Sequence, residues 1–345
     1  MKIGIVSTAV PHVNGGYRFI VDWLHAKLQE YGHQVETIYI PTTDEPDHIF
    51  TQMTALRMIN FEDYYDRIIT TRPQAHVIQH SRKVAWFIHH IRVYYDLWDT
   101  EYHPYDGSAR VLAQRNALIT ADTNSLQDAH RLFTNSRVVR DRLMRYNALN
   151  AEVLYPPLFR PEDYYTKEYG QEIVCICRVE HHKRQHMLVE AMAHTKSPVR
   201  LRICGDSLNQ NYLSTLRRRA ERLGVEDRIN FNFTWISETE KIDLLANALA
   251  AAYLPLDEDS YGYPTIEAAH ANKCTVTLTD SGGVSEFVIN GETGFIVEPE
   301  PELIAEAFDM LYDNKEVARK MGQSANSRVT ELGINWDTVI GKLLS

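Results

Sequence analysis

Leu-Pro-Leu-Asp-Glu-Asp-Ser-Tyr-Gly-Tyr-Pro-Thr-Ile-Glu-Ala-Ala, residues 254–269, is the stretch around which the rest of the chain is organised. The apolar run 249–254 predicts a short buried strand, and the run from Thr265 to Ala271 predicts a helix with Thr265 as its cap. Because a helix start presents unpaired backbone N–H groups, this one suits an anion such as a phosphate. A carboxylate in the first turn of such a helix does not suit an anion, so we interpret Glu267 as an acceptor of sugar or ribose hydroxyls.

Two acids, Asp259 and Glu267, lie eight residues apart in this stretch, with Gly262 between them. The arrangement resembles the E-x7-E motif of retaining glycosyltransferases of family 4, with Asp259 in place of the more usual Glu. The resemblance implies an α/β chain with the GT-B fold, in which two Rossmann-like, doubly wound parallel-sheet domains face a cleft. It also implies transfer of a sugar from a nucleotide-diphosphate sugar, UDP- or GDP-linked, to a saccharide or lipid-linked saccharide acceptor. We expect a role in cell-surface glycan, polysaccharide or glycolipid synthesis.

Length and composition fit this expectation. A chain of 345 residues with 44% hydrophobic content can form two globular domains. The formal net charge of −10 argues against a nucleic-acid partner. The basic run Arg217 to Arg219 is flanked by Glu221, so we interpret it as a solvated helix face, with peripheral contact to an anionic membrane as the alternative.

No run approaches the roughly 18 apolar residues of a membrane span, and no signal-peptide core follows the first strand. We expect a cytoplasmic protein, either free or at the inner face of the membrane.

The four cysteines are Cys175, Cys177, Cys204 and Cys274. Cys175 and Cys177 share one face of a predicted strand, but we expect them to lie too far apart along it for a disulfide. No His or Cys spacing typical of a metal site is present. The sequence therefore predicts buried structural thiols, with no metal and no cofactor.

The N-terminal half begins as a βαβ unit. The run 2–7 predicts a strand, 17–31 a helix and 35–40 a second strand, and the loop between the first two contains Gly15 and Gly16. A Gly pair without G-x-G-x-x-G is explained equally well by a tight backbone turn. The resemblance assigns Gly15 and Gly16 to a loop that reaches toward the donor phosphates and the acceptor.

His89 and His90 follow a predicted strand, 84–88, at the edge of the sheet where ligands bind in open α/β folds. A packing or surface role is the more common one for a single histidine. Members of the family place a His here that contacts the donor sugar, and we choose His89 first and His90 second. Further on, Asn135 or Ser136 can cap a helix.

A Pro pair at 156–157 stops a short predicted strand and marks the domain boundary. The second half then alternates strands and helices again, which predicts a second parallel sheet. We therefore expect one domain over 1–158 and a second over 159–330, which the resemblance identifies as the acceptor-side and the nucleotide-sugar domain. The resemblance also implies that a C-terminal helix within 331–345 crosses back to the first domain.

Arg178 and Lys183 follow the predicted strand 173–177. Both could be ordinary surface charges, but in the family this R-x4-K spacing supplies the two cations that hold the nucleotide diphosphate. Arg184 replaces the Gly that usually follows the Lys. The Gly-Gly pair at 282–283 matches another family turn, although a simple tight turn explains it equally well. The remaining residues that the resemblance assigns to the donor site are Gly205, Trp235, Ile236, Tyr261, Gly262, Tyr263, Pro264, Thr265 and Glu267.

The chemistry implied by the resemblance divides roles among Arg178, Lys183, Asp259, Glu267 and His89. The two cations and a helix N-terminus stabilise the departing diphosphate without a metal, Asp259 and His89 contact the donor sugar, and Glu267 binds the ribose. No general base is assigned.

Two alternatives remain open. The acidic triplet at 257–259 spells the D-x-D of metal-dependent GT-A enzymes, and Asp259 in place of Glu is compatible with a non-catalytic or regulatory nucleotide-sugar-binding protein on a GT-B scaffold.

Overall fold

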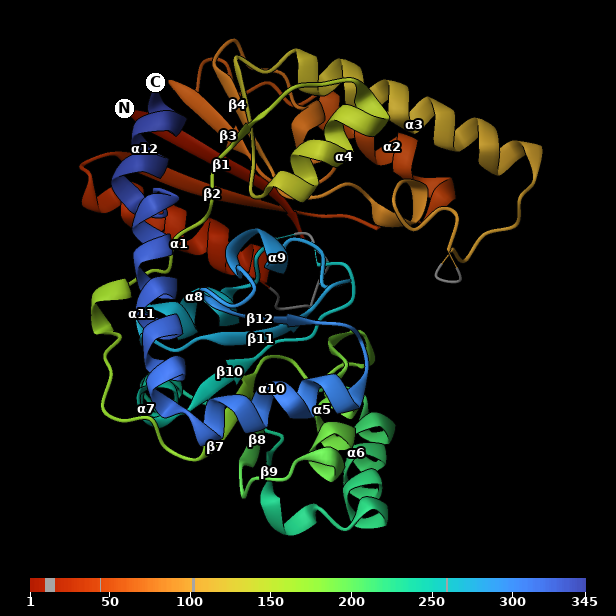
Figure 1. The fold of residues 1–345 in the computed structure, drawn as a ribbon. Helices are drawn as coiled ribbons and strands as arrows, with labels where there is room; N and C mark the ends of the chain where they lie inside the picture. Colours follow the sequence, from red (N-terminus) through yellow and green to blue (C-terminus); the bar gives the residue numbers. More distant parts are fainter. Residues whose placement is uncertain (10–15, 44, 101–102, 259) are drawn as a thin grey trace. The chain divides into compact units, whose positions relative to one another are not determined.

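The computed structural model describes residues 1–9, 16–43, 45–100, 103–258 and 260–345. They form two compact units, Met1–Phe159 with Ile334–Ser345, and Arg160–Gly333. Each unit contains one parallel β-sheet with helices packed against it (Figure 1). The prediction of two doubly wound α/β units is therefore confirmed.

The described strands of the first unit form a sheet in the order β2-β1-β3-β4-β5-β6. Their bounds are β1 (Lys2–Ala9), β2 (Gln34–Pro41), β3 (Arg67–Thr70), β4 (Lys83–Phe87), β5 (Arg131–Thr134) and β6 (Glu152–Val153). Seven of the eight residues of β1 are buried, as expected for a strand covered on both faces. The strand order reverses between β1 and β3, so this sheet has its topological switch point there.

The helices of the first unit surround this sheet. Their bounds are α1 (Gly16–Glu30), α2 (Pro46–Arg57), α3 (Ala109–Gln127), α4 (Arg137–Asn147) and α12 (Trp336–Leu344). Of the two predicted caps for α4, Ser136 is the one used, because its Oγ accepts a hydrogen bond from Val139 N at 3.2 Å. Helix α12 is anchored within this unit, since Trp336 Nε1 donates to the Leu158 carbonyl at 2.7 Å.

The described strands of the second unit form a sheet in the order β12-β11-β10-β7-β8-β9. Their bounds are β7 (Glu172–Ile176), β8 (Arg200–Cys204), β9 (Ile229–Asn232), β10 (Ala250–Ala252), β11 (Thr275–Leu278) and β12 (Gly294–Val297). This is the strand order of a dinucleotide-binding Rossmann sheet, and it reverses between β7 and β10. In such sheets ligands bind outside the carboxyl ends of the strands, at the reversal.

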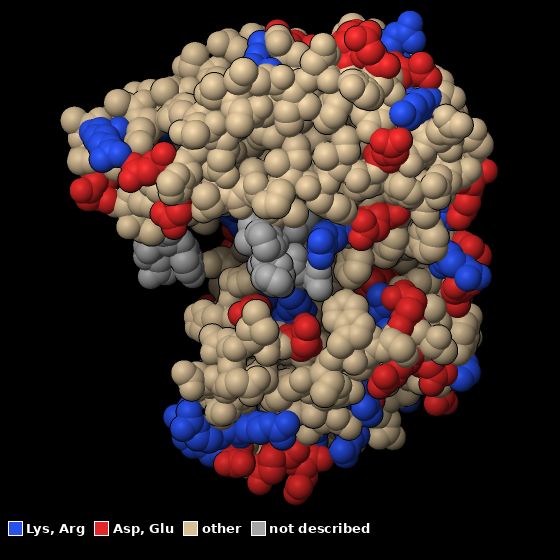
Figure 2. Space-filling model, turned by 180° about the vertical axis from the view of Figure 1, so that it is seen from behind, with Lys and Arg blue, Asp and Glu red and all other residues tan. Residues whose placement is uncertain are grey.

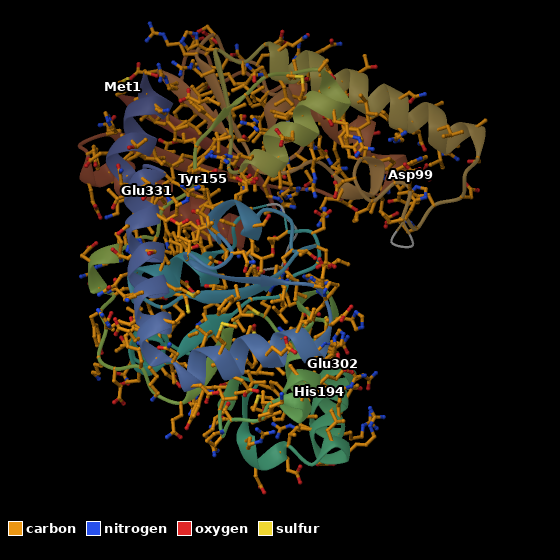
Figure 3. All side chains as sticks on the ribbon, in the orientation of Figure 1. Met1, Asp99, Tyr155, His194, Glu302 and Glu331 are labelled. Carbon is orange, nitrogen blue, oxygen red and sulfur yellow. The ribbon has the colours of Figure 1, made fainter. Side chains whose placement is uncertain are left out.

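The helices of the second unit are α5 (Gln185–His194), α6 (Gln210–Leu223), α7 (Glu238–Asn247), α8 (Tyr263–His270), α9 (Val284–Phe287), α10 (Pro301–Asp313) and α11 (Lys315–Glu331). Helices α5, α6 and α10 bury one face of the sheet through side chains such as Leu188, Leu216 and Phe308, which are all inaccessible to solvent. At the rim of this layer, His194 of α5 lies beside Glu302 of α10 (Figure 3), with Nε2 and Oε1 3.4 Å apart.

The prediction that Cys175 and Cys177 form no disulfide is confirmed. Cys175 lies in β7 and Cys177 directly follows it, and their Sγ atoms are 3.8 Å apart, well beyond the length of an S–S bond. All four cysteines are free thiols, and Cys175, Cys204 and Cys274 are buried, as predicted.

The surface is mixed in charge. Figure 2 shows basic and acidic side chains interspersed over one face. The run Arg217 to Arg219 lies on α6, where Arg217 and Arg218 are exposed and Arg219 pairs with Glu190 at 2.5 Å, so the prediction of a solvated helix face is confirmed. In the described part of the chain, every helix is too short or too polar to cross a membrane.

Candidate functional site

Arg178 and Lys183 lie at the carboxyl end of β7, beside the strand-order reversal of the second sheet. The backbone of Arg178 is fixed by Gln185, whose Nε2 donates to the Arg178 carbonyl at 2.9 Å, while the Arg178 side chain is exposed. Lys183 ends the short 3-10 helix η4 (His181–Lys183), and only 11% of its side chain is exposed. Both cations therefore occupy the place where an open α/β sheet binds ligands.

The ammonium of Lys183 is held by two residues that follow β10. Its Nζ donates to Tyr253 Oη at 2.7 Å and forms an ion pair with Glu258. The Tyr253 hydroxyl in turn donates to Glu258 Oε2 at 2.7 Å. Burial raises the pKa of Tyr253, so the hydroxyl stays protonated and remains a donor. Sequence reasoning did not single out Tyr253 or Glu258 as partners of Lys183.

Arg184 shows why the family usually has Gly at this position. Its backbone is left-handed, with φ of 54°, a conformation that Gly adopts more readily than other residues. The buried guanidinium forms several hydrogen bonds. It donates to the carbonyls of Leu254 at 2.8 Å and Pro255 at 2.9 Å and to both carboxylate oxygens of Asp280. Arg184 therefore fastens the loop after β10 to the segment that carries Lys183.

The loop at 256–258 is also held through its backbone. Leu256 N donates to the His182 carbonyl at 2.8 Å, and Gly283 N donates to the Glu258 carbonyl at 3.0 Å. A Cβ atom at Gly282, whose φ is 61°, would lie 2.6 Å from the Glu258 carbonyl oxygen. The Gly-Gly pair thus allows two loops to approach each other closely, which is more than a simple tight turn requires.

Helix α8 begins earlier than expected, and Thr265 is not its cap. The N-cap is Gly262, which has φ of 70° and gives no side-chain cap. A Cβ atom there would lie 2.3 Å from Tyr253 Cε1, so only Gly fits against the tyrosine ring. Thr265 is the third residue of the helix, and its buried Oγ1 has no hydrogen-bond partner among the residues that the structure describes. The cap prediction failed because the Gly before Tyr263 already turns the chain.

Glu267 is the fifth residue of α8 and therefore not in its first turn, contrary to the prediction. Its side chain is buried, and Oε1 lies 2.5 Å from Lys241 Nζ on α7. Burial raises the pKa of Glu267, and the Lys241 ammonium offsets part of this effect. The sequence does not predict the pairing of Lys241 with Glu267, because nothing in the local pattern of α7 marks this lysine as the partner of an acid on another helix.

The other predicted donor-site residues of the second unit follow β8, β9 or β10, at the carboxyl edge of the same sheet. Gly205 directly follows β8, and Trp235, 66% exposed, and Ile236 lie between β9 and α7. Tyr261 is buried before α8, whereas Tyr263 and Pro264, its first two residues, are half-buried. Gly16 begins α1 in the first unit. Asp259 and Gly15 lie outside the described residues.

The two histidines after β4 have different environments. His90 is buried against Tyr95 and its Nε2 lies 2.9 Å from Asn147 Oδ1. Burial lowers the pKa of His90 to about 4, so it is a neutral core residue at physiological pH. His89 is half-buried, with Nδ1 2.6 Å from the His90 carbonyl oxygen. Its more accessible side chain makes it the candidate of the two for a ligand contact.

The described residues contain no cluster of three or more His, Cys, Asp or Glu side chains with an arrangement that could hold a metal ion. In the acidic triplet at 257–259, the carboxylate of Glu258 is engaged by Lys183. The triplet also lies in the second of two Rossmann-like units, whereas the GT-A alternative places it within a single one.

Comparison with known proteins adds a family match and a fold match. Residues 162–328 match the family model described as glycosyl transferases group 1. The alpha-1,3/1,6-mannosyltransferase ALG2 of Dictyostelium discoideum is 30% identical over 39% of this chain and 33% of its own length. The GDP-mannose-dependent alpha-(1-6)-phosphatidylinositol monomannoside mannosyltransferase of Mycobacterium tuberculosis is 29% identical over 50% of this chain and 46% of its own. The chain thus spans less than half the length of these curated relatives.

Among solved structures, Anabaena Alr3699/HepE in complex with UDP and glucose superimposes with a TM-score of 0.71 over 98% of both chains, at 16% sequence identity. This likeness covers both units and shows the shared fold, so the GT-B prediction is confirmed. The family match lies within the second unit, which also carries Arg178 and Lys183. The second unit is therefore similar to glycosyl transferases group 1, and the chain as a whole has the GT-B fold.

Proposed function

We propose that the protein transfers a sugar from a nucleoside diphosphate sugar to an acceptor hydroxyl, with retention at the anomeric carbon and without a metal ion. The observation that carries this proposal is the position of Arg178 and Lys183 at the strand-order reversal of the second sheet, inside the family match. A relative named as GDP-mannose-dependent and a similar fold solved with UDP and glucose indicate the donor class.

The two cations suit the leaving group. When the glycosidic phosphate bond breaks, the diphosphate gains negative charge, and positively charged donors that already face it stabilise the transition state more than the ground state. Lys183 is largely shielded from water, which strengthens its interaction with that charge. Removal of one such donor costs about 3 kcal/mol in comparable sites.

In the reaction that we propose, the bond between the anomeric carbon and the phosphate oxygen breaks, and the acceptor oxygen bonds to the same face of that carbon. The leaving phosphate oxygen takes the proton of the acceptor hydroxyl, so no protein base is needed. Glu267 accepts hydrogen bonds from the ribose, because its ion pair with Lys241 fixes the carboxylate. Asp259 and His89 contact the donor sugar, and the acceptor is a saccharide or lipid-linked saccharide.

A panel of UDP-, GDP- and ADP-sugars tests the proposal, first by thermal shift and then by release of the nucleoside diphosphate in the presence of saccharide acceptors. A donor at a hundred times its Kd adds about 2.7 kcal/mol to the free energy of unfolding. We expect one nucleotide class to stabilise the fold and to be consumed, and NMR of the product to show the donor's anomeric configuration. Stabilisation without consumption would indicate a non-catalytic nucleotide-sugar-binding protein, and the absence of both would contradict the proposal.

A further inference from the structure

We propose that Glu258 is a resident anion of the diphosphate site. It holds Lys183 when no donor is bound and competes with the diphosphate for that lysine, which weakens the binding of nucleoside diphosphates and favours release of the product. The proposal rests on the proposed function and gives Glu258 a role separate from those of Asp259 and Glu267.

The first support is the contact itself. Lys183 and Glu258 form an ion pair in which only 11% and 22% of the two side chains are exposed. Tyr253 joins the pair, because its hydroxyl accepts from Lys183 and donates to Glu258, each at 2.7 Å. The lysine that faces the diphosphate in our proposal is therefore already neutralised by a carboxylate of the same chain.

The second support is that the loop is built to hold Glu258 in place. Asp257, the preceding residue, has φ of 44°, which is a strained conformation for a residue other than Gly. Such strain persists only where the surroundings impose it, and it is concentrated at functional sites. Here the surroundings are a backbone bridge from Glu258 to Gly282 and the Arg184 hydrogen bonds to the carbonyls of Leu254 and Pro255.

The third step is electrostatic. A diphosphate that binds Lys183 comes close to the Glu258 carboxylate, and like charges in a partly desolvated site repel strongly. The bound anion must therefore draw Lys183 away from Glu258 or displace the carboxylate. A free nucleoside diphosphate carries one more negative charge than the same group linked to a sugar. Glu258 thus weakens the binding of the product more than that of the donor.

Calorimetry with UDP and GDP, and with the matching nucleotide sugar, tests this role in the full-length chain. We expect Glu258→Gln to bind the free nucleoside diphosphate about fivefold or more tightly than the wild type, with a smaller gain for the nucleotide sugar. The gain should disappear when Glu258→Gln is combined with Lys183→Met, because the competition is for that lysine. A residue that only supports the loop would give weaker or unchanged binding.

Glu172→Gln is the matched control. Glu172 is 26% exposed and pairs with Arg202 at 2.8 Å, but it lies at the amino end of β7, opposite Lys183. The control should leave nucleotide affinity unchanged. If Glu258→Gln fails to fold in a thermal unfolding scan, Glu258→Asp replaces it, because its shorter arm withdraws the carboxylate from Lys183 and must also tighten binding.

The outcomes separate this proposal from the proposed function. If the wild type binds a nucleoside diphosphate and the folded Glu258 variants bind it no more tightly, the role of Glu258 is wrong and the proposed function stands. If neither the wild type nor the variants bind any nucleotide, both the proposed function and the role of Glu258 are wrong.

Discussion

Arg184 donates from its two terminal nitrogens to the two carboxylate oxygens of Asp280, at 2.7 and 2.6 Å. The same guanidinium donates to the carbonyls of Leu254 and Pro255. These bonds join the segments that follow β7, β10 and β11 within the second unit. One buried side chain therefore links the loops that carry Lys183 and Glu258, in addition to the backbone hydrogen bonds of the loop 256–258.

Arg184→Gly tests this dependence. Gly relieves the left-handed backbone at this position, but it leaves two carbonyls and a carboxylate without their donor. We expect the lost hydrogen bonds to cost more than the relieved backbone strain returns. The free energy of unfolding, measured by urea unfolding, should therefore fall by about 2 kcal/mol. Arg319→Ala, which breaks an exposed pair with Glu316, is the control and should change little. An Arg184→Gly variant as stable as the wild type would show that the clamp contributes nothing.

Asp259 and Glu267 should have unequal effects on nucleotide binding. Glu267→Gln removes the charge but keeps an oxygen for Lys241, so the helix survives while the ribose contact weakens. We expect its affinity for free UDP or GDP to drop roughly tenfold. Asp259→Asn should leave that affinity within about threefold and depress transfer strongly, whereas Asp259→Glu should retain activity or change the accepted sugar. Equal losses of nucleotide affinity in calorimetry would refute this division of roles.

The sequence predicts those parts of the site that depend on local pattern. The position of Arg178 and Lys183 after β7 follows from this pattern, because both come within a few residues of one strand, and their role at a diphosphate stays a prediction. The pairing of Glu267 with Lys241 could not be predicted, because it joins two helices whose relative rotation is set by packing. The hydrogen bonds that Arg184 forms could not be predicted for a similar reason. Its left-handed backbone and its partners after β10 and β11 are properties of the folded sheet, and the sequence shows only an unusual residue at a Gly position.

Stability should fall in acid partly through His90. Its pKa is lowered to about 4 by burial, against about 6.5 in the unfolded chain, so the unfolded state binds more protons between these values. The neutral, buried His90 therefore makes its full contribution to the free energy of unfolding above about pH 6.5. This contribution is lost as the pH falls toward 4, with roughly 2 kcal/mol lost between about pH 7.5 and pH 5. His90→Gln, which keeps a donor for Asn147, should show a shallower pH dependence in urea unfolding. Parallel curves for the two proteins would contradict this prediction.

Activity should not depend on a divalent metal. The carboxylate of Glu258 is engaged by Lys183, and the cations of the site supply the charge that a metal would otherwise bring. We expect transfer to continue in excess EDTA. Activity that EDTA abolishes and Mn²⁺ restores would instead favour a metal site at the acidic triplet 257–259.

The most direct test of the account is the effect of Lys183→Ala on kcat/KM for the nucleotide sugar, measured with the donor below saturation. Lys320→Ala, which removes a lysine that is 71% exposed on α11, serves as the control and should behave like the wild type. Because the charge facing Lys183 grows in the transition state, we expect kcat/KM to fall by about two powers of ten or more while the fold is retained. Near-native kcat/KM in Lys183→Ala would contradict the assignment of the diphosphate site to the strand-order reversal of the second sheet.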